Sequence, residues 1–214
     1  MLRRLFMTSP LFSTVVVTAL VFATSFVAGH AHSAATVGQQ APEFSAADTA
    51  GRPHRLSDFK GRYVVLEWTN PGCPFVRKHY ESANMQGVQK DATARGVVWL
   101  AVASTAPDSA DYRSPGELGR WMTGKGAGAT ATLMDEDGAI GKAYGARTTP
   151  HLYIVNPQGR LVYAGGIDSL ASTRVADVGT ATNYVRQGLN EALAGKPLTA
   201  ATTRPYGCSI KYKS

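Results

Sequence analysis

The sequence is poor in cysteine, and this scarcity excludes several classes of protein. Cys73 and Cys208 are the two cysteines among its 214 residues. Two thiols are too few for a disulfide-stapled scaffold, or for a zinc or iron–sulfur site built on thiolates. They are enough for one redox centre. The question that the sequence raises is whether this pair is structural or chemically reactive.

The sequence also lacks any block of like charge. The net charge is +7, but lysine and arginine are scattered, so no basic patch for nucleic acid is present. His54, His79 and His151 lie far apart and show no metal-ligand spacing. We therefore expect no metal, no cofactor and no nucleic-acid partner. The length and the hydrophobic share of 44% fit one ordinary domain with a sizeable core.

Long apolar runs are missing except near the N-terminus. Arg3 and Arg4 precede an apolar run over residues 11–28, and small residues follow it. This order is typical of an export signal, which we place at residues 1–35. An uncleaved membrane anchor is the alternative, because the run is close to the lower length limit for a span. We expect an exported, periplasmic protein, in a compartment where disulfides persist.

Beyond this segment, predicted strands and helices alternate. Runs of β-formers at residues 63–68 and 97–102 flank a helical pattern over 74–95, an order that predicts a right-handed βαβ unit. Further along we expect helices at 115–123, 139–144 and 182–194, a strand at 132–134, and a hairpin of 152–155 with 161–164. Residues 36–196 are therefore predicted to form one α/β domain.

Cys73 lies between the first strand and the following helix, directly before Pro74. Proline suits the first helical position, which places Cys73 at the N-cap, where free backbone amides and the helix dipole favour a thiolate. Arg77, Lys78 and His79 bring cations into the first two turns, and an anion at Cys73 offsets their unfavourable interaction with the dipole. These residues predict a nucleophilic sulfur whose thiolate Arg77 stabilises. An inert buried cysteine beside a solvated basic face is the alternative.

Glu67 stands in the middle of the first apolar strand, where burying a carboxylate is costly. Burial raises the pKa of a carboxyl group, so Glu67 is a candidate proton carrier for thiol chemistry at neutral pH. The alternatives are a side chain that points past a sheet edge or one that pairs with lysine or arginine.

Several motifs carry a family resemblance. Val-Val-Leu-Glu-Trp occupies residues 64–68, Asn-Pro-Gly-Cys-Pro-Phe-Val residues 70–76, and Arg-Thr-Thr-Pro residues 147–150. The sequence thereby resembles the thioredoxin superfamily, and more closely the peroxiredoxin-like redoxins related to the alkyl hydroperoxide reductase and thiol-specific antioxidant group. Residues 204–212 are similar to the tail of one exported subfamily. The resemblance covers nearly all of residues 36–214 and implies a thioredoxin-like fold, with a central mixed β-sheet flanked by helices and an extended C-terminal tail.

The resemblance also assigns roles. Cys73 matches the attacking cysteine, and Glu67 falls where thioredoxins hold a buried acid near their cysteine pair. Thr149 and Pro150 match a threonine–cis-proline element that faces the active sulfur and aligns an extended substrate, although the residues alone favour a trans bond. The implied activity is that of a thiol-dependent oxidoreductase. Its partners would be a protein or small-molecule thiol, disulfide or peroxide, and an external thiol that donates electrons.

The sequence departs from both family patterns. Val76 stands where thioredoxins carry their second cysteine, so a local dithiol exchange is excluded. Asn70 stands where peroxiredoxins place a threonine, and Arg147 lies a few residues before the position of their arginine. These departures put rapid peroxide reduction in doubt.

Cys208 lies in a tail, residues 197–214, for which the sequence indicates little anchoring. We hypothesise that Cys73 attacks a disulfide or peroxide and that the mobile tail brings Cys208 to resolve the product. The alternative is a permanent Cys73–Cys208 disulfide in a redox-inert binding module, whose groove beside Pro150 recognises a partner peptide.

Overall fold

A computed structural model of the chain describes residues 34–213. The predicted export signal at residues 1–35 therefore lies almost entirely outside the described residues. At its end, the Ala35 amide donates to the Ala143 carbonyl at 3.0 Å. Between residues 34 and 213, no helix has both the length and the apolar character that a membrane crossing requires.

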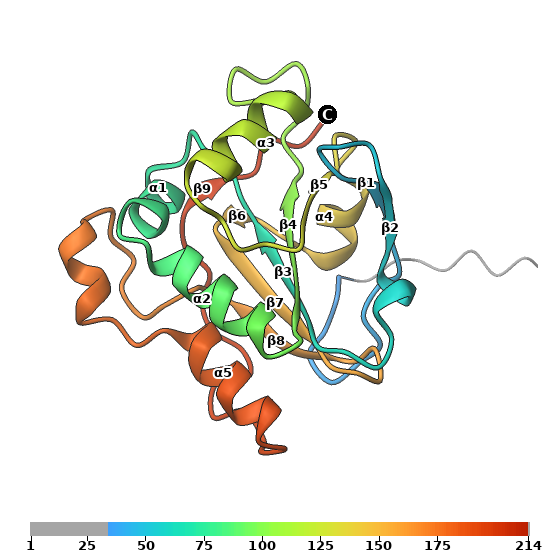
Figure 1. Cartoon of the computed structure of the whole chain (residues 1–214), viewed down its shortest axis with the longest axis vertical. Helices are drawn as coiled ribbons and strands as arrows, with labels where there is room; N and C mark the ends of the chain where they lie inside the picture. The colour runs from blue at the N-terminus through green and yellow to red at the C-terminus, as the bar shows by residue number, and fades with distance from the viewer. Residues whose placement is uncertain (1–33, 214) are drawn as a thin grey trace, which may run out of the picture. The chain divides into compact units, whose positions relative to one another are not determined.

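A five-stranded mixed sheet forms the centre of the fold (Figure 1). Its strands, in spatial order, are β5 (Ala131–Met134), β4 (Val98–Ala103), β3 (Val64–Trp68), β7 (His151–Val155) and β8 (Leu161–Gly165). Strands β3, β4 and β5 are parallel, whereas β7 is antiparallel to β3 and to β8. The strands β3 and β4 are central because their side chains are apolar on both faces. This is the thioredoxin-like architecture that the resemblance implied.

Helices cover both faces of this sheet. The helices are α1 (Pro74–Glu81), α2 (Asn84–Ala94), α3 (Pro115–Gly124), α4 (Ala139–Tyr144) and α5 (Tyr184–Leu193), with short 3-10 helices η1 (Leu56–Phe59) and η2 (Val175–Gly179). The other strands are β1 (Ser45–Ala47), β2 (Pro53–Arg55), β6 (Thr148–Thr149) and β9 (Cys208–Ser209). In Figure 1, α1, α2 and α5 lie on one side of the sheet and α4, β1 and β2 on the other.

Successive side chains of β3 point to opposite faces of the sheet, and each face has its own hydrophobic cluster. Val65 packs with buried residues of α1, α2 and α5, whereas Val64, Leu66 and Trp68 pack with residues of α4 and the N-terminal segment. Glu67 shares the face of Val65, since side chains two apart in a strand point the same way. Cys73 belongs to the same cluster as Val65.

The helix expected over 74–95 is wrong in one respect, because the structure has two helices there. α1 ends at Glu81, and Ala83 adopts a left-handed conformation with φ of +57° before α2 begins. The Ser82 hydroxyl donates a hydrogen bond to the His79 carbonyl and accepts one from the Asn84 amide. These bonds satisfy a carbonyl at the end of α1 and an amide at the start of α2. Because alanine is a good helix former, the residue pattern gave no sign of this break.

The expectation of a weakly anchored tail is also corrected, because the tail is bound along its length. The Thr203 amide donates to the Ala164 carbonyl at 3.1 Å, and the Ile210 amide to the Arg147 carbonyl at 3.1 Å. Tyr212 donates its hydroxyl to the Ala146 carbonyl at 2.7 Å. Between these contacts, β9 pairs with β6, so the tail passes directly over the end of α1 that carries Cys73.

Candidate active site

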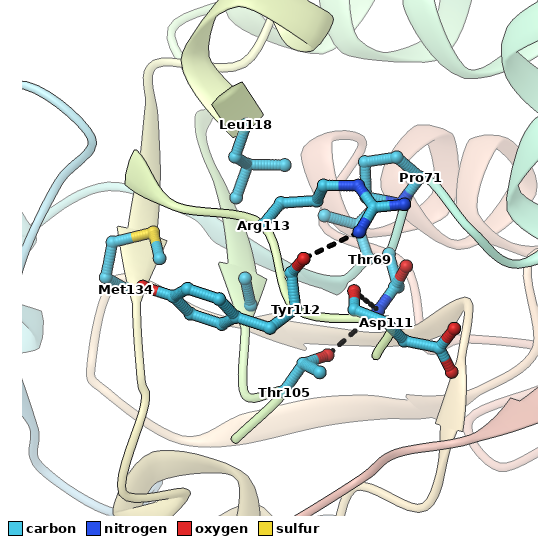
Figure 2. Close-up of a pocket in the computed structure, with 10 residues that line it drawn as sticks. Thr69, Pro71, Thr105, Asp111, Tyr112, Arg113, Leu118 and Met134 are labelled. Atoms are coloured by element: carbon cyan, nitrogen blue, oxygen red, sulfur yellow. Dashed lines mark hydrogen bonds between the residues drawn. The ribbon is translucent and has the colours of Figure 1, made fainter. Parts of the chain in front are cut away.

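The turn between β3 and α1 positions Cys73, which is the N-cap of α1 as the sequence predicted. Asn70 holds this turn. Its Oδ1 accepts from the Gly72 amide at 2.7 Å. Its Nδ2 donates to Thr105 Oγ1 at 2.9 Å and to the Asp111 carbonyl at 3.2 Å, two bonds drawn as dashed lines at the labelled Thr105 and Asp111 in Figure 2. Sequence reasoning treated Asn70 as a departure from a family pattern and missed this role. An asparagine two residues before glycine is the local signal for such a turn.

The Cys73 sulfur makes different contacts from those expected. It accepts no capping hydrogen bond from the first turn of α1. It donates instead to the Thr149 carbonyl at 3.0 Å, and it lies 2.7 Å from the Cys208 sulfur. Both cysteines are free thiols in this structure. The fold thus brings together two sulfurs that are 135 residues apart in the sequence.

Thr149 and Pro150 lie against this sulfur pair. Their peptide bond is cis, as the resemblance implied. Thr149 pairs with Cys208 in the short β6–β9 ladder, so one residue contacts both sulfur-bearing segments. Gly207 crosses this bond with φ of +138°, and a Cβ there would collide with the Thr149 carbonyl. Only glycine lets the tail pass this close.

The environment of Cys208 keeps its thiol protonated. Burial raises the pKa of Cys208, and the adjacent Cys73 sulfur and the Asp111 carboxylate raise it further. Lys211 acts in the opposite direction. Cys208 is half-buried, whereas Cys73 is buried. The thiolate is the attacking form in disulfide exchange, so Cys208 must give up this proton before it can attack a mixed disulfide at Cys73.

Arg77 is not placed at the sulfur. Its side chain is 58% exposed, and its Nε pairs with Glu81 at 3.3 Å on the outer face of α1. This corrects the expectation that Arg77 stabilises the Cys73 thiolate. The Arg77 side chain extends along the exposed surface of α1 to a carboxylate one turn further on, which competes with the sulfur for its charge. Lys78 and His79, which follow it, are buried.

Glu67 is buried in a site made of hydrogen-bond donors. Tyr80 Oη donates to its Oε1 at 2.9 Å, and Gln89 Nε2 and Trp99 Nε1 donate to its Oε2 at 2.8 and 2.7 Å. Burial raises the pKa of Glu67 to about 7, against the lowering effect of these three bonds. Both alternatives from the sequence, a side chain past the sheet edge and a pair with lysine or arginine, are therefore excluded. Among residues 34–213, no hydrogen bond joins Glu67 to Cys73.

Little open space remains around the sulfurs. The pocket that both cysteines line has a volume of about 30 Å³, and the neighbouring pocket in Figure 2, beside Thr105 and Asp111, about 10 Å³. A single water needs roughly 10–15 Å³ by this measure. The Cys73 sulfur is thus buried beneath the tail in the dithiol state and has little direct access to a polypeptide. The tail supplies one wall of the closed pocket through Ser209, Ile210 and Lys211.

Comparisons with protein families and with known proteins give the relatives of this chain. Residues 37–164, more than half of the chain, match the model of the AhpC/TSA family. The chain belongs to the AhpC/TSA family. It is 26% identical over 132 residues to the thiol-disulfide oxidoreductase ResA of Bacillus subtilis, a match that covers 58% of this chain and 64% of that protein. The chain therefore spans slightly less than two thirds of this curated relative.

Two solved structures extend the similarity beyond the AhpC/TSA match. A conserved uncharacterized protein from Geobacillus kaustophilus has a TM-score of 0.72 at 26% identity, covering 83% of this chain and 93% of that one. A hypothetical protein from Sinorhizobium meliloti 1021 has a TM-score of 0.71 at 24% identity, covering 85% and 97%. The AhpC/TSA match ends at residue 164, so the Cys208 tail lies outside it.

Proposed function

We propose that the chain is an exported thiol-disulfide oxidoreductase of the AhpC/TSA family, with Cys73 as nucleophile and Cys208 as resolving cysteine. One observation carries the proposal: two free thiols lie 2.7 Å apart at the N-terminus of a helix. The similarity to a relative named thiol-disulfide oxidoreductase supports it. The apolar N-terminal run supports export to the periplasm.

The proposed cycle uses both sulfurs in turn. The Cys73 thiolate attacks one sulfur of an external disulfide, so a Cys73–substrate S–S bond forms and the other substrate half leaves as a thiolate that takes up a proton. The Cys208 sulfur then gives up its proton and attacks Cys73, releasing the second substrate thiol and forming the Cys73–Cys208 disulfide. The substrate gains two electrons and two protons, and an external thiol later returns them to the protein.

Three further residues have supporting roles in this proposal. Thr149 and Pro150 align the tail segment that carries Cys208 beside Cys73. The Thr149 carbonyl contacts the Cys73 sulfur, and the Thr149 backbone pairs with that of Cys208. Glu67, with its pKa raised to about 7, exchanges protons in the working range of thiol chemistry. We assign it as a positioning and electrostatic group, because its bonded partners are Tyr80, Gln89 and Trp99 rather than a sulfur.

Peroxide is the less favoured substrate. Asn70 uses both its side-chain atoms to hold the turn before Cys73, and Arg147 contacts the tail and His151 through its backbone. The Asn70 side chain is therefore committed to the turn and is not free to bind a peroxide as the threonine of the family pattern would. Disulfide exchange needs only the sulfur pair.

Trapping tests the assignment. A Cys208→Ser variant cannot resolve, so a mixed disulfide with Cys73 should accumulate when the protein is incubated with oxidised glutathione or an oxidised polypeptide. Intact-mass spectrometry should find the adduct on Cys208→Ser, and a matched Cys73→Ser variant should carry much less. Recovery of unmodified Cys208→Ser under these conditions would contradict the function and favour the redox-inert binding module.

A further inference from the structure

Four side chains outside the sulfur pair meet between α1 and the tail. Lys78 and His79 come from α1, Asp168 from the loop after β8, and Tyr206 from the tail. The side chains of Lys78 and His79 are 0% exposed and that of Asp168 is 2% exposed, which is rare for groups that carry charge. We refer to these four residues as the latch cluster.

The hydrogen bonds of the latch cluster meet at the Tyr206 hydroxyl. It donates to Asp168 Oδ1 at 2.5 Å and accepts from His79 Nε2 at 3.0 Å and from Lys78 Nζ at 3.3 Å. Asn84 Nδ2 donates to His79 Nδ1 at 2.8 Å, which places the proton of the neutral ring on Nε2. The hydroxyl thus uses its one donor and both acceptor positions.

The remaining contacts of Lys78 disfavour a state in which Tyr206 is undocked while Lys78 and Asp168 stay buried. Lys78 Nζ lies 3.6 Å from Asp168 Oδ2, donates to the Leu170 carbonyl at 3.2 Å, and stands 5.3 Å from the centre of the Tyr206 ring. Burial lowers the pKa of Lys78, while the Asp168 carboxylate opposes that shift. Removing the Tyr206 hydroxyl leaves buried polar groups of this ion pair without one of their hydrogen-bond partners, which is unfavourable. The α1 side and the Asp168 loop therefore favour the docked position of Tyr206.

The latch cluster is connected to both sulfurs. Tyr206 precedes Cys208 by two residues, a span of at most roughly 7 Å of extended chain, so fixing its ring restricts where Cys208 lies. Lys78 and His79 belong to the helix that Cys73 caps. Phe75, in the first turn of that helix, packs edge-on against Tyr206 with ring centroids 5.7 Å apart.

We propose that the latch cluster is a positioning device, which holds Cys208 on Cys73 and keeps the site closed in the dithiol state. The proposal rests on the proposed function and deepens it: Cys73 is buried beneath the tail, so a polypeptide disulfide reaches its sulfur only after the tail is released. Tyr206 is its central positioning residue. The two cysteines remain the reacting groups.

The experiment measures how often Cys73 becomes accessible. In a Cys208→Ser background, Cys73 is the one remaining thiol, and its alkylation by iodoacetamide at pH 7 is followed by mass spectrometry. Adding Tyr206→Phe removes the hydroxyl but keeps the ring and its contact with Phe75. We expect alkylation to be at least about tenfold faster, with faster hydrogen exchange at the Ile210 amide and smaller changes in strands β3 and β4.

Tyr63→Phe in the same background is the matched control, since it removes a half-buried hydroxyl that donates to the Ala192 carbonyl at 3.0 Å, outside the tail. Its alkylation rate should stay within about twofold of the background. An unchanged rate in Tyr206→Phe, or an equal acceleration in Tyr63→Phe, overturns the proposal. The alkylation assay needs no redox partner. If Tyr206→Phe accelerates alkylation but no mixed disulfide is trapped on Cys208→Ser, only the proposed function is contradicted.

Discussion

At the scale of single residues, Glu67 shows most clearly how the fold sets chemistry. A carboxyl group that lies in a central strand is removed from water, and this desolvation outweighs three donated hydrogen bonds and raises its pKa to about 7. The donors come from α1, α2 and β4, so the site exists only in the folded protein. Glu67 therefore links folding and proton uptake near neutral pH.

Replacing Glu67 by glutamine should remove a pH-dependent part of stability. The folded state binds the Glu67 proton more tightly than the unfolded chain, so its contribution is present below pH 4.5 and is lost as the pH rises through about 7. A shift of this size corresponds to about 3 kcal/mol. Urea unfolding from pH 4.5 to 8 should show wild type losing stability relative to Glu67→Gln by about that amount. A constant difference between the two proteins across this range would contradict the raised pKa.

Buried histidines give a pH dependence of the opposite sign. Burial lowers the pKa of His79 and of His151 to about 4, so the unfolded chain takes up these protons first as the pH falls. Their contribution is complete above pH 6.5 and is lost toward pH 4. We expect the free energy of unfolding to fall between pH 7 and 5, and His79→Gln to reduce the slope. A steeper slope in that variant would be inconsistent with a neutral buried His79.

At the scale of elements, the tail strand β9 determines what Cys73 can contact. Its two residue pairs with β6 bring Cys208 beside Thr149 in a fixed register. Gly207 makes this approach possible, since any side chain at that position meets the Thr149 carbonyl. The latch cluster on one side and the Tyr212 hydrogen bond on the other hold the strand at both ends.

Gly207→Ala should therefore lift β9 from β6. We expect faster hydrogen exchange at the Ile210 amide and faster alkylation of Cys73 in the Cys208→Ser background. Gly195→Ala is a suitable control: its φ of +69° is also left-handed, but a Cβ there meets nothing within 4 Å. Alanine is strained at the positive φ of both positions, and at Gly207 the collision with the Thr149 carbonyl is added to this strain. Equal exchange at Ile210 in the two variants would show that the close approach does not hold the tail.

The elements also show what local pattern can and cannot predict. The strands β3 and β4, the helix α4 and the β7–β8 hairpin were predicted nearly as they occur, because burial on both faces and turn residues are local signals. The N-cap position of Cys73 was predicted for the same reason. The break at Ala83 is not predicted by local pattern. Alanine favours helix, and tertiary contacts override that preference at this position.

At the scale of the whole molecule, the site depends on contacts between distant segments. Cys73, Thr149 and Cys208 meet because β7 lies beside β3 and the tail returns across both. Local motifs and the family resemblance predict a role for each of these three residues. The predictions of a loosely held tail and of Arg77 beside the sulfur are wrong, because distant segments bind the tail and Arg77 pairs with a carboxylate on its own helix. The buried partners of Tyr206 come from three segments, and no spacing in the sequence relates them.

The redox equilibrium of the Cys73–Cys208 pair with glutathione decides whether these two cysteines form a reversible redox pair. The protein is equilibrated over a series of glutathione ratios, alkylated, and analysed by mass spectrometry, with Cys73→Ser as the control that cannot form the internal disulfide. We predict a single two-electron transition with a potential above about −300 mV, the range of catalytic and regulatory disulfides. A potential below that value, or no Cys73–Cys208 disulfide at any ratio, would contradict a reversible redox pair.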